Sequence, residues 1–276
     1  MRRLRSVERS THLSVQTSFL PSPHALLWAL IQRDFRERYI GTASGLLWAF
    51  LGPALTLLIY AFVFQTLMKV RVPSIGAAGF VPFLALGLWP WYAFSDAVAR
   101  GTTAIVSNAP LLGKIAMPRY VLVLVPVLSS FAIHMLGLIA VIVALAATGT
   151  ALHWAALPLV LACLLGMLVL SIGIAFWLAT LNVFLRDVSA MLPQLLTFWM
   201  LITPIFFHGA SLSPAMLGLL SHNPMLGFID ALRAGLLQLP GPTPGVMLEA
   251  CLWSLLALFS GGFVFARSAP HFEDYL

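Results

Sequence analysis

Residues that could perform acid–base or nucleophilic chemistry are few, and they are dispersed along the chain. The seven histidines show no spacing that suits a metal site, and no nucleophile can be paired with a general base. The two lysines, Lys69 and Lys114, do not lie in the G-x-x-x-x-G-K-[ST] loop that holds nucleotide phosphates. We therefore predict no catalytic residue, no metal site and no cofactor on this chain. A process driven by ATP would need ATP and Mg to be bound by a partner subunit.

One alternative of another class is an integral-membrane enzyme that modifies a lipid. Such an enzyme would need an essential acid or histidine within an apolar segment, and Asp96, Glu249 and His134 are the candidates. A simpler interpretation of Asp96 is an intramembrane ion pair with Arg100, four residues later on the same helical face. Glu249 lies near the end of an apolar segment, where its side chain can reach the polar interface.

The composition indicates that most of the chain is solvated by lipid. The chain has 276 residues, of which 61% are hydrophobic and 9% are charged, and its mean hydropathy is +0.98. Soluble domains carry roughly 25% charged residues. We therefore predict an all-α polytopic membrane protein. Seven of the fifteen basic residues lie before Gly41 and the others are scattered singly, so we expect a topology signal and no nucleic-acid partner.

Six apolar segments are long enough, or nearly so, to cross a bilayer, which takes roughly 20 helical residues. They are residues 44–68, 80–106, 120–147, 157–184, 191–207 and 246–266. An even number puts both termini on one side, and a cytoplasmic N-terminus leaves twelve of the fifteen basic residues in the cytoplasm. We expect an N-in, C-in domain over residues 41–276, preceded by a basic tail over 1–20.

Residues 21–40 have the pattern of an amphipathic helix that precedes the first span. Its apolar face would hold Leu27, Trp28, Ile31 and Phe35, and its charged face Arg33, Arg36 and Glu37. Two i,i+4 pairs are expected, Arg33 with Glu37 and Asp34 with Arg38. The helix could anchor the chain in the headgroup layer. Its mixed charge favours instead a contact with a protein partner, made by Arg33, Asp34, Arg36 and Glu37.

The loop 107–119 is the most informative connection on the cytoplasmic side. Asn108 can cap a short helix there, and its apolar face of Leu111, Leu112 and Ile115 would lie beside Lys114. An exposed helix of this kind suits docking into a groove of a partner, and Asn108, Leu111, Leu112 and Lys114 are the expected contacts. The alternative is an ordinary turn that lies on the membrane.

Two short helices are predicted between the fifth and sixth spans, within residues 213–239. Ser213–Pro214 and Asn223–Pro224 each combine an N-cap residue with a proline at the first helical position. These pieces are too short to span, so they should be re-entrant or interfacial on the outer side. Asp230 and Arg233 are three residues apart and could pair, or Arg233 could meet an anionic ligand at this outer gate.

Aromatic residues are abundant in three of the segments. Their ordinary role would be core packing or an interfacial belt. A sharper hypothesis is a translocation path on which sugar rings stack, since aromatic faces suit a pyranose and tolerate sliding. The residues expected to line it are Tyr60, Phe64, Trp89, Phe198, Trp199, Phe206 and Phe207.

Several motifs in a fixed order carry a resemblance to a known family. They are R-D-F-R-E-R-Y-I-G-T-A-S-G-L-L-W-A-F-L-G-P at 33–53, N-A-P-L-L-G-K-I-A-M-P-R at 108–119, L-N-V-F-L-R-D-V at 181–188, T-P-I-F-F at 203–207, N-P-M at 223–225 and F-E-D-Y-L at 272–276. Together they resemble the membrane (permease) subunit of a type-2 ABC transporter (ABC-2 family), in the branch that exports O-antigen and related polysaccharides.

The resemblance implies a bacterial inner-membrane homodimer with two copies of a separate nucleotide-binding ATPase subunit. Its cargo would be a polyprenyl-diphosphate-linked glycan. The helix at 21–40 would be the interface helix, residues 108–117 the coupling helix and residues 213–239 the outer gate helices. The path would follow the dimer axis, faced by the first and fifth spans. Other cargoes within the same family are capsular polysaccharide, teichoic acid, drugs and lipids.

Overall fold

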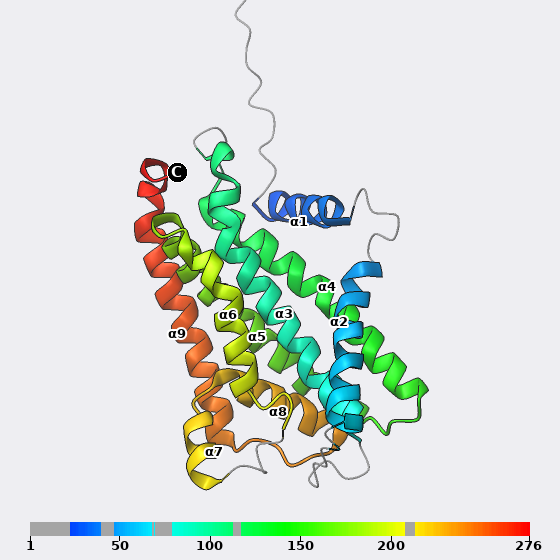
Figure 1. Ribbon diagram of the computed structural model, residues 1–276. Coiled ribbons are helices and arrows are strands. Elements are labelled where there is room, and N and C mark those ends of the chain that lie inside the picture. Colours follow the sequence, from blue (N-terminus) through cyan, green and yellow to red (C-terminus); the bar gives the residue numbers. More distant parts are fainter. Residues whose placement is uncertain (1–22, 40–46, 68, 70–78, 113–116, 208–212) are drawn as a thin grey trace, which may run out of the picture.

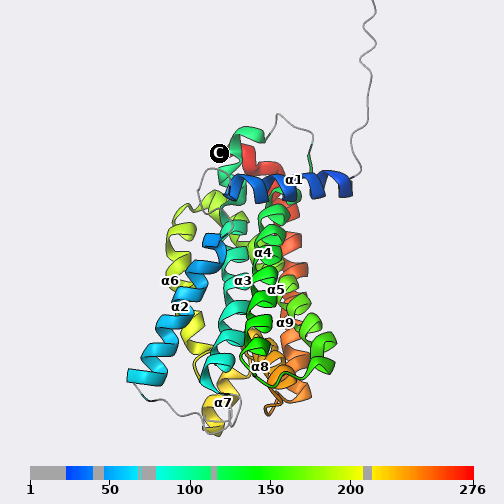
Figure 2. The same cartoon turned by 90° about the vertical axis from the view of Figure 1, so that its right-hand side faces the viewer.

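The computed structural model describes residues 23–39, 47–67, 69, 79–112, 117–207 and 213–276. These ranges are helical, with turns between the helices, and they contain no strand. Helix α1, Pro23–Tyr39, lies crosswise at one end of a bundle of long helices (Figure 1). The C-terminus lies at the same end as α1, and the short helices α7, Pro214–Leu220, and α8, Pro224–Leu237, lie at the opposite end (Figure 2).

The long elements of the bundle follow the apolar segments of the sequence. They are α2 (Leu47–Ala61) with the π-helix η1 (Phe62–Leu67), α3 (Phe80–Ser107), α4 (Arg119–Ala147), α5 (Leu157–Phe184), α6 (Asp187–Ile202) and α9 (Pro244–Ser268). Among the described residues, four stretches are long and apolar enough to cross a membrane: Phe50–Leu67, Arg119–Ala147, Trp154–Phe184 and Pro244–Asp274.

Helices α3 and α6, the other two elements of the predicted six-span arrangement, are not among these four stretches, for separate reasons. Helix α3 has 28 residues, but its Trp, Tyr and Pro residues and its two charges make it less apolar. Helix α6 has 16 residues, or about 24 Å of rise, against a hydrocarbon core of about 30 Å. It begins at Asp187 and ends at Ile202, so residues 203–207, predicted to complete the fifth span, form a turn instead.

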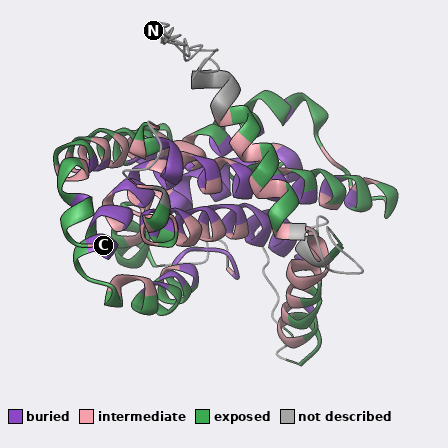
Figure 3. Ribbon diagram, turned by 90° about the horizontal axis from the view of Figure 1, so that it is seen from above, coloured by how far each residue is buried: buried purple, intermediate pink, exposed green. Residues whose placement is uncertain are grey.

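Helix α3 occupies the middle of the bundle, which explains why it can be less apolar than its neighbours. Its buried residues cover all sides of the helix, and Phe83, Leu84 and Phe94 have no exposed surface. Figure 3 shows buried residues in the centre of the bundle and exposed residues around its rim. Close packing is helped by small residues: a Cβ added at Gly173 of α5 would lie 2.3 Å from the backbone of Ala257 in α9.

Large apolar side chains point outward around the rim. Five of them are each more than half exposed: Leu58 on α2, Phe62 on η1, Phe198 on α6, and Phe259 and Phe263 on α9. Water would solvate such a continuous apolar rim poorly, whereas lipid chains solvate it well. The rim therefore suits a position within a membrane.

The two outer helices begin at the residues predicted to cap them. The Ser213 hydroxyl accepts a hydrogen bond from the Met216 backbone N–H at 3.4 Å, and Asn223 Oδ1 accepts one from the Met225 N–H at 3.1 Å. Asn223 also bonds to Trp199 and Thr203 at the end of α6. The N-cap of α8 therefore fixes this helix against the C-terminal end of α6.

Candidate functional site

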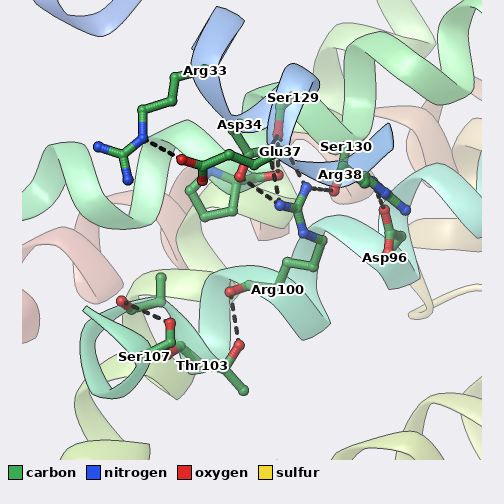
Figure 4. Close-up of polar contacts among 12 residues, drawn as sticks. Arg33, Asp34, Glu37, Arg38, Asp96, Arg100, Thr103, Ser107, Ser129 and Ser130 are labelled. Carbon is green, nitrogen blue, oxygen red and sulfur yellow. Dashed lines mark hydrogen bonds and ion pairs between the residues drawn. The ribbon is translucent and has the colours of Figure 1, made fainter. Parts of the chain in front are cut away.

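Helix α1 is joined to the bundle by an ion pair that is largely shielded from solvent. Both carboxylate oxygens of Asp34 accept hydrogen bonds from Nη2 of Arg100 on α3, at 2.7 and 2.8 Å (Figure 4). Nη1 of Arg100 donates to the hydroxyls of Ser129 and Ser130 on α4, each at 3.1 Å. Ser129 in turn donates to Asp34. Three helices therefore converge on one arginine.

A second ion pair joins α1 to α3 one helical turn away. Nη1 of Arg38 donates to Oδ2 of Asp96 at 3.0 Å, and Nε2 of His134 on α4 lies 3.6 Å from the same oxygen. Asp34 of α1 therefore pairs with Arg100 of α3, and Arg38 of α1 pairs with Asp96 of α3. We call these four residues the α1 clamp.

The α1 clamp corrects two predictions made from i,i+4 spacing. Asp96 does not pair with Arg100, and Asp34 does not pair with Arg38, because each finds its opposite charge on the other helix. Spacing along one helix identifies residues on a common face, but it does not show which charges another helix brings to that face. The Ser129–Ser130 pair was missed as well. Two adjacent hydroxyls in an otherwise apolar segment were the available signal.

Beside the α1 clamp, α1 presents other charged side chains to solvent. Arg33 and Glu37 form the predicted i,i+4 pair at 2.6 Å, and their side chains are 58% and 62% exposed. Arg36 is also exposed, and so is Trp28, which was expected on the apolar face. Asp34 was predicted to share the partner-facing surface, but it points into the bundle. We define the outer face of α1 as Arg33, Arg36 and Glu37.

The predicted coupling helix at 108–117 is described only in part. A single 3₁₀ turn covers Ala109–Leu111, and Leu112 packs against the core. Asn108 Nδ2 donates to the Ala104 carbonyl at 2.8 Å, so its side chain closes α3 rather than capping the next helix. Lys114 and its neighbours at 113–116 lie outside the described residues, as does the side chain of Leu111. A crevice of about 270 Å³ lies between α1 and helices α3 and α4, with Asn108 and Met117 among its lining residues.

The aromatic residues predicted for the path fall into separate groups. At the end remote from α1, the Phe206 ring lies 5.1 Å from the rings of both Tyr60 and Phe64, and Phe207 is half-buried nearby in sequence. Trp199 packs edge-on against Trp91 and Phe94 in the interior. The structure does not bring all seven predicted residues together.

Two further members of that set have contrasting environments. Trp89 is 3% exposed and packs against Gly137, where an added Cβ would lie 2.4 Å from its Nε1. Phe198 on α6 is 64% exposed and faces away from the bundle. Trp89 is therefore a core residue in this chain, and Phe198 is available to lipid or to another protein.

A cleft of about 520 Å³ lies between α2 and α6, over α3, with α1 at one edge. We call it the polar cleft, because it combines aromatic rings with polar groups of the α1 clamp. Its lining residues are Arg38, Pro53, Thr56, Tyr60, Trp91, Tyr92, Ser95, Asp96, Ala99, His134, Pro193, Leu196, Thr197 and Met200.

Arg233 is a structural residue and not an outer ligand site. Its side chain is 1% exposed, and Nη1 and Nη2 donate to the carbonyls of Pro204 and Ile205 at 2.6 and 2.7 Å. The guanidinium lies 3.7 Å from the centre of the Phe83 ring. The predicted pairing with Asp230 is present at 3.7 Å. An anionic ligand at the outer surface cannot reach this arginine, because the turn after α6 covers it.

Most of the chain is similar in sequence to a known protein family. Residues 25–237 match the family described as ABC-2 type transporter. The chain belongs to the ABC-2 type transporter family. The match begins within α1 and continues through α8, so it includes the α1 clamp, the polar cleft and the outer helices.

Named relatives of this ABC-2 type transporter act in polysaccharide export. An O-antigen export system permease protein RfbA from Myxococcus xanthus is 30% identical over 90% of this chain and 94% of its own length. RfbA from Klebsiella pneumoniae is 27% identical over 75% of this chain and 78% of its own length. The polysialic acid transport protein KpsM from Escherichia coli is 25% identical over 84% of this chain and 86% of its own length.

Membership of the ABC-2 type transporter family makes this a multi-pass inner-membrane permease and not a catalytic enzyme. The residues considered for an enzyme also fail to form one site. Asp96 and His134 lie in the polar cleft, whereas Glu249 bonds to His222 at 2.6 Å and to Trp253 at 3.3 Å near the outer helices.

Proposed function

We propose that this chain is the membrane subunit of an ATP-driven exporter that moves a polyprenyl-diphosphate-linked polysaccharide, such as O-antigen, across the bacterial inner membrane. Six spans, formed by α2–η1, α3, α4, α5, α6 and α9, would place both termini in the cytoplasm. Two copies of the chain would form the path, and two copies of a separate ATPase would bind ATP and Mg. The arrangement of α1 and the C-terminus at one end of the bundle supports this topology (Figure 1).

The observation that carries the proposal is the way α1 is held. The α1 clamp fixes one side of the helix to α3 and α4, while the outer face of α1 remains charged and exposed. A helix held in this way can transmit a push from a protein below it into the bundle. The ATPase would contact the outer face of α1 and the neighbouring turn at 108–117.

The cargo assignment rests on the relatives. The names of the Myxococcus xanthus and Klebsiella pneumoniae relatives specify O-antigen export. Capsular polysaccharide is the second candidate, favoured by the similarity to the polysialic acid transport protein. Both are polysaccharides, so a path that tolerates sliding sugar rings would serve either.

The first test is genetic and biochemical. Deleting the chain should remove the polysaccharide from the cell surface and leave it lipid-linked inside the cell, as seen by gel analysis of surface and total glycan. The tagged chain should copurify with an ATPase subunit. Unchanged surface polysaccharide after deletion, or a purified chain that hydrolyses ATP alone, would contradict the proposal.

The second test concerns the contact surface. Replacing Arg33, Arg36 and Glu37 by alanine should reduce recovery of the ATPase at least about tenfold, which corresponds to about 1.4 kcal/mol. The matched control is alanine at Arg186 and Asp187, an exposed charged pair at the start of α6. Equal loss in both variants would show that surface charge in general, and not the outer face of α1, holds the ATPase.

A further inference from the structure

The polar cleft contains polar groups that the α1 clamp does not fully use. His134 is 8% exposed, and its Nε2 faces Asp96. Among the residues that the structure describes, its Nδ1 has no hydrogen-bond partner. This nitrogen has almost no exposed surface, so it does not itself face the cleft. His134 and Asp96 both line the polar cleft, and the Asp96 side chain is 26% exposed.

Three hydroxyls of the polar cleft are oriented as acceptors. Thr56 donates its hydroxyl hydrogen to the Gly52 carbonyl at 3.0 Å, and Thr197 donates to Pro193 at 2.8 Å. Ser95 donates to the Tyr92 carbonyl at 3.3 Å. A hydroxyl whose hydrogen is used in this way retains its lone pairs for another donor. Asp96 adds a carboxylate, which accepts only.

These acceptors line the cleft together with Tyr60, Tyr92 and Arg38, whose hydroxyl and guanidinium groups can donate, so the lining suits a ligand that both donates and accepts. A sugar carries several hydroxyl donors, so it can satisfy a carboxylate and several oxygen lone pairs at once. A diphosphate group consists of acceptors, and Asp96 would repel it. The charge of Arg38, the cation at the edge of the polar cleft, is already opposed by Asp96 at 3.0 Å.

The shape of the polar cleft also fits a sugar ring. Its volume of about 520 Å³ lies within the range of about 300–1,000 Å³ that is common for small-molecule sites. Tyr60 and Tyr92 line it with half-buried rings. Aromatic faces pack against the C–H face of a pyranose, while hydroxyls at the ring edge remain free to form hydrogen bonds.

We propose that the polar cleft binds one sugar residue of the cargo through its hydroxyl groups, with Asp96 as the principal contact and His134 positioning its carboxylate. This inference rests on the proposed function, because it assigns a place to the polysaccharide that the protein exports. Arg38 of α1 shares Asp96 with the sugar. A shift of α1 would therefore change what Asp96 can accept, and would link ATPase movement to the hold on the cargo.

The test is photo-cross-linking in cells that make the native lipid-linked polysaccharide. A benzoylphenylalanine is placed at Thr197, which lines the polar cleft, or at Leu195, which is exposed on the same helix outside it. The complete complex is irradiated and purified, and attached glycan is detected by sugar staining and mass spectrometry. We expect at least about five times more glycan on position 197 than on position 195.

Variants then show whether the polar groups hold the sugar. His134→Gln should lower the adduct at position 197 at least about threefold while ATPase copurification stays unchanged. If that variant lowers the yield of the complex, Thr56→Val gives the same comparison. Thr148→Val is the matched control, because Thr148 donates to its own helix at 2.9 Å but lies outside the polar cleft.

Three results would overturn the inference: equal adducts at 197 and 195, an adduct at 197 that the His134 and Thr56 variants leave unchanged, or an adduct with phospholipid that carries no sugar. These three results differ from the result that would refute the proposed function. That result is a surface polysaccharide that stays unchanged when the chain is deleted.

Discussion

Loss of Arg100 should release α1 from the bundle, and the size of the effect can be worked out from the α1 clamp. Arg100 and Asp34 are 26% and 21% exposed. Breaking an exposed pair costs about 0–1 kcal/mol, and breaking a buried one about 3–5 kcal/mol. A pair that is about three-quarters buried should fall between these limits, at about 2 kcal/mol. The undocked population of α1 should then rise about 30-fold in an Arg100→Met variant.

The assay is the labelling rate of a cysteine placed beneath α1. Val125 lines the crevice between α1 and the bundle and is 9% exposed, so Val125→Cys should react slowly with a soluble maleimide while α1 is docked and faster when α1 moves away. Labelling should be about 30-fold faster with Arg100→Met. Cys163 is buried and Cys251 is exposed, so the rate without Val125→Cys gives the background.

Glu37→Gln is the matched control, because it removes an exposed ion pair from the same helix and leaves the α1 clamp intact. An exposed i,i+4 pair contributes about 0.3–0.5 kcal/mol, so labelling should change by about twofold. The double variant Asp34→Asn/Arg100→Met should be labelled more slowly than the summed effects of the two single variants would give. The difference should correspond to a coupling energy of at least about 1 kcal/mol. Equal rates in Arg100→Met and Glu37→Gln would refute the reasoning.

Two further predictions concern the outer end of the bundle, both measured as shifts in thermal midpoint of the purified protein in detergent. Gly87→Ala should destabilise the folded protein by at least about 3 kcal/mol, because the new Cβ would lie 1.8 Å from Nη2 of Arg233 and displace a buried cation. Its control is Gly52→Ala, which has open space around the new Cβ and should be neutral or stabilising. Asn223→Ala should cost about 2–3 kcal/mol, because it removes the N-cap of α8 and the bond from Trp199 at 3.0 Å. A stable Gly87→Ala protein, or an Asn223→Ala protein with an unchanged midpoint, would contradict the respective prediction.

Features governed by neighbouring residues in the sequence could be predicted well. Helices α4 and α5 have bounds within one residue of the segments read from hydropathy, because a long apolar run leaves the backbone no alternative to helix in lipid. Ser213 and Asn223 were predicted as N-caps because a cap followed by proline is a local signal. The ends of α6 were harder, since the chain remains apolar beyond Ile202 where the helix stops.

Features that depend on contacts between distant residues could not be predicted. Arg233 illustrates this best. The turn after α6 leaves the carbonyls of Pro204 and Ile205 without helical partners, and Arg233 supplies donors from α8. Nothing near Arg233 in the sequence indicates that these carbonyls need a donor. The spacing to Asp230 suggested a pair, and that pair is present, but it is only one part of the environment.

The charges of the α1 clamp show why the sequence permitted two interpretations and the structure selects one. Within each helix, the acid and the arginine lie four residues apart, Asp34 with Arg38 and Asp96 with Arg100. Each helix could therefore neutralise itself. In the docked arrangement both carboxylates bond across the gap instead, and Ser129 and Ser130 add hydrogen bonds that intrahelical pairs would lack.

The same spacing reduces the free-energy cost of separating α1 from α3. In an undocked α1, Asp34 would remain within reach of Arg38, and in α3, Asp96 would remain within reach of Arg100. Separation of the two helices would therefore leave no charge without an opposite partner. A clamp built from two self-complementary helices holds firmly when closed and opens without stranding a charge. That combination suits a helix which is pushed by a partner during each transport cycle better than a fixed apolar contact would.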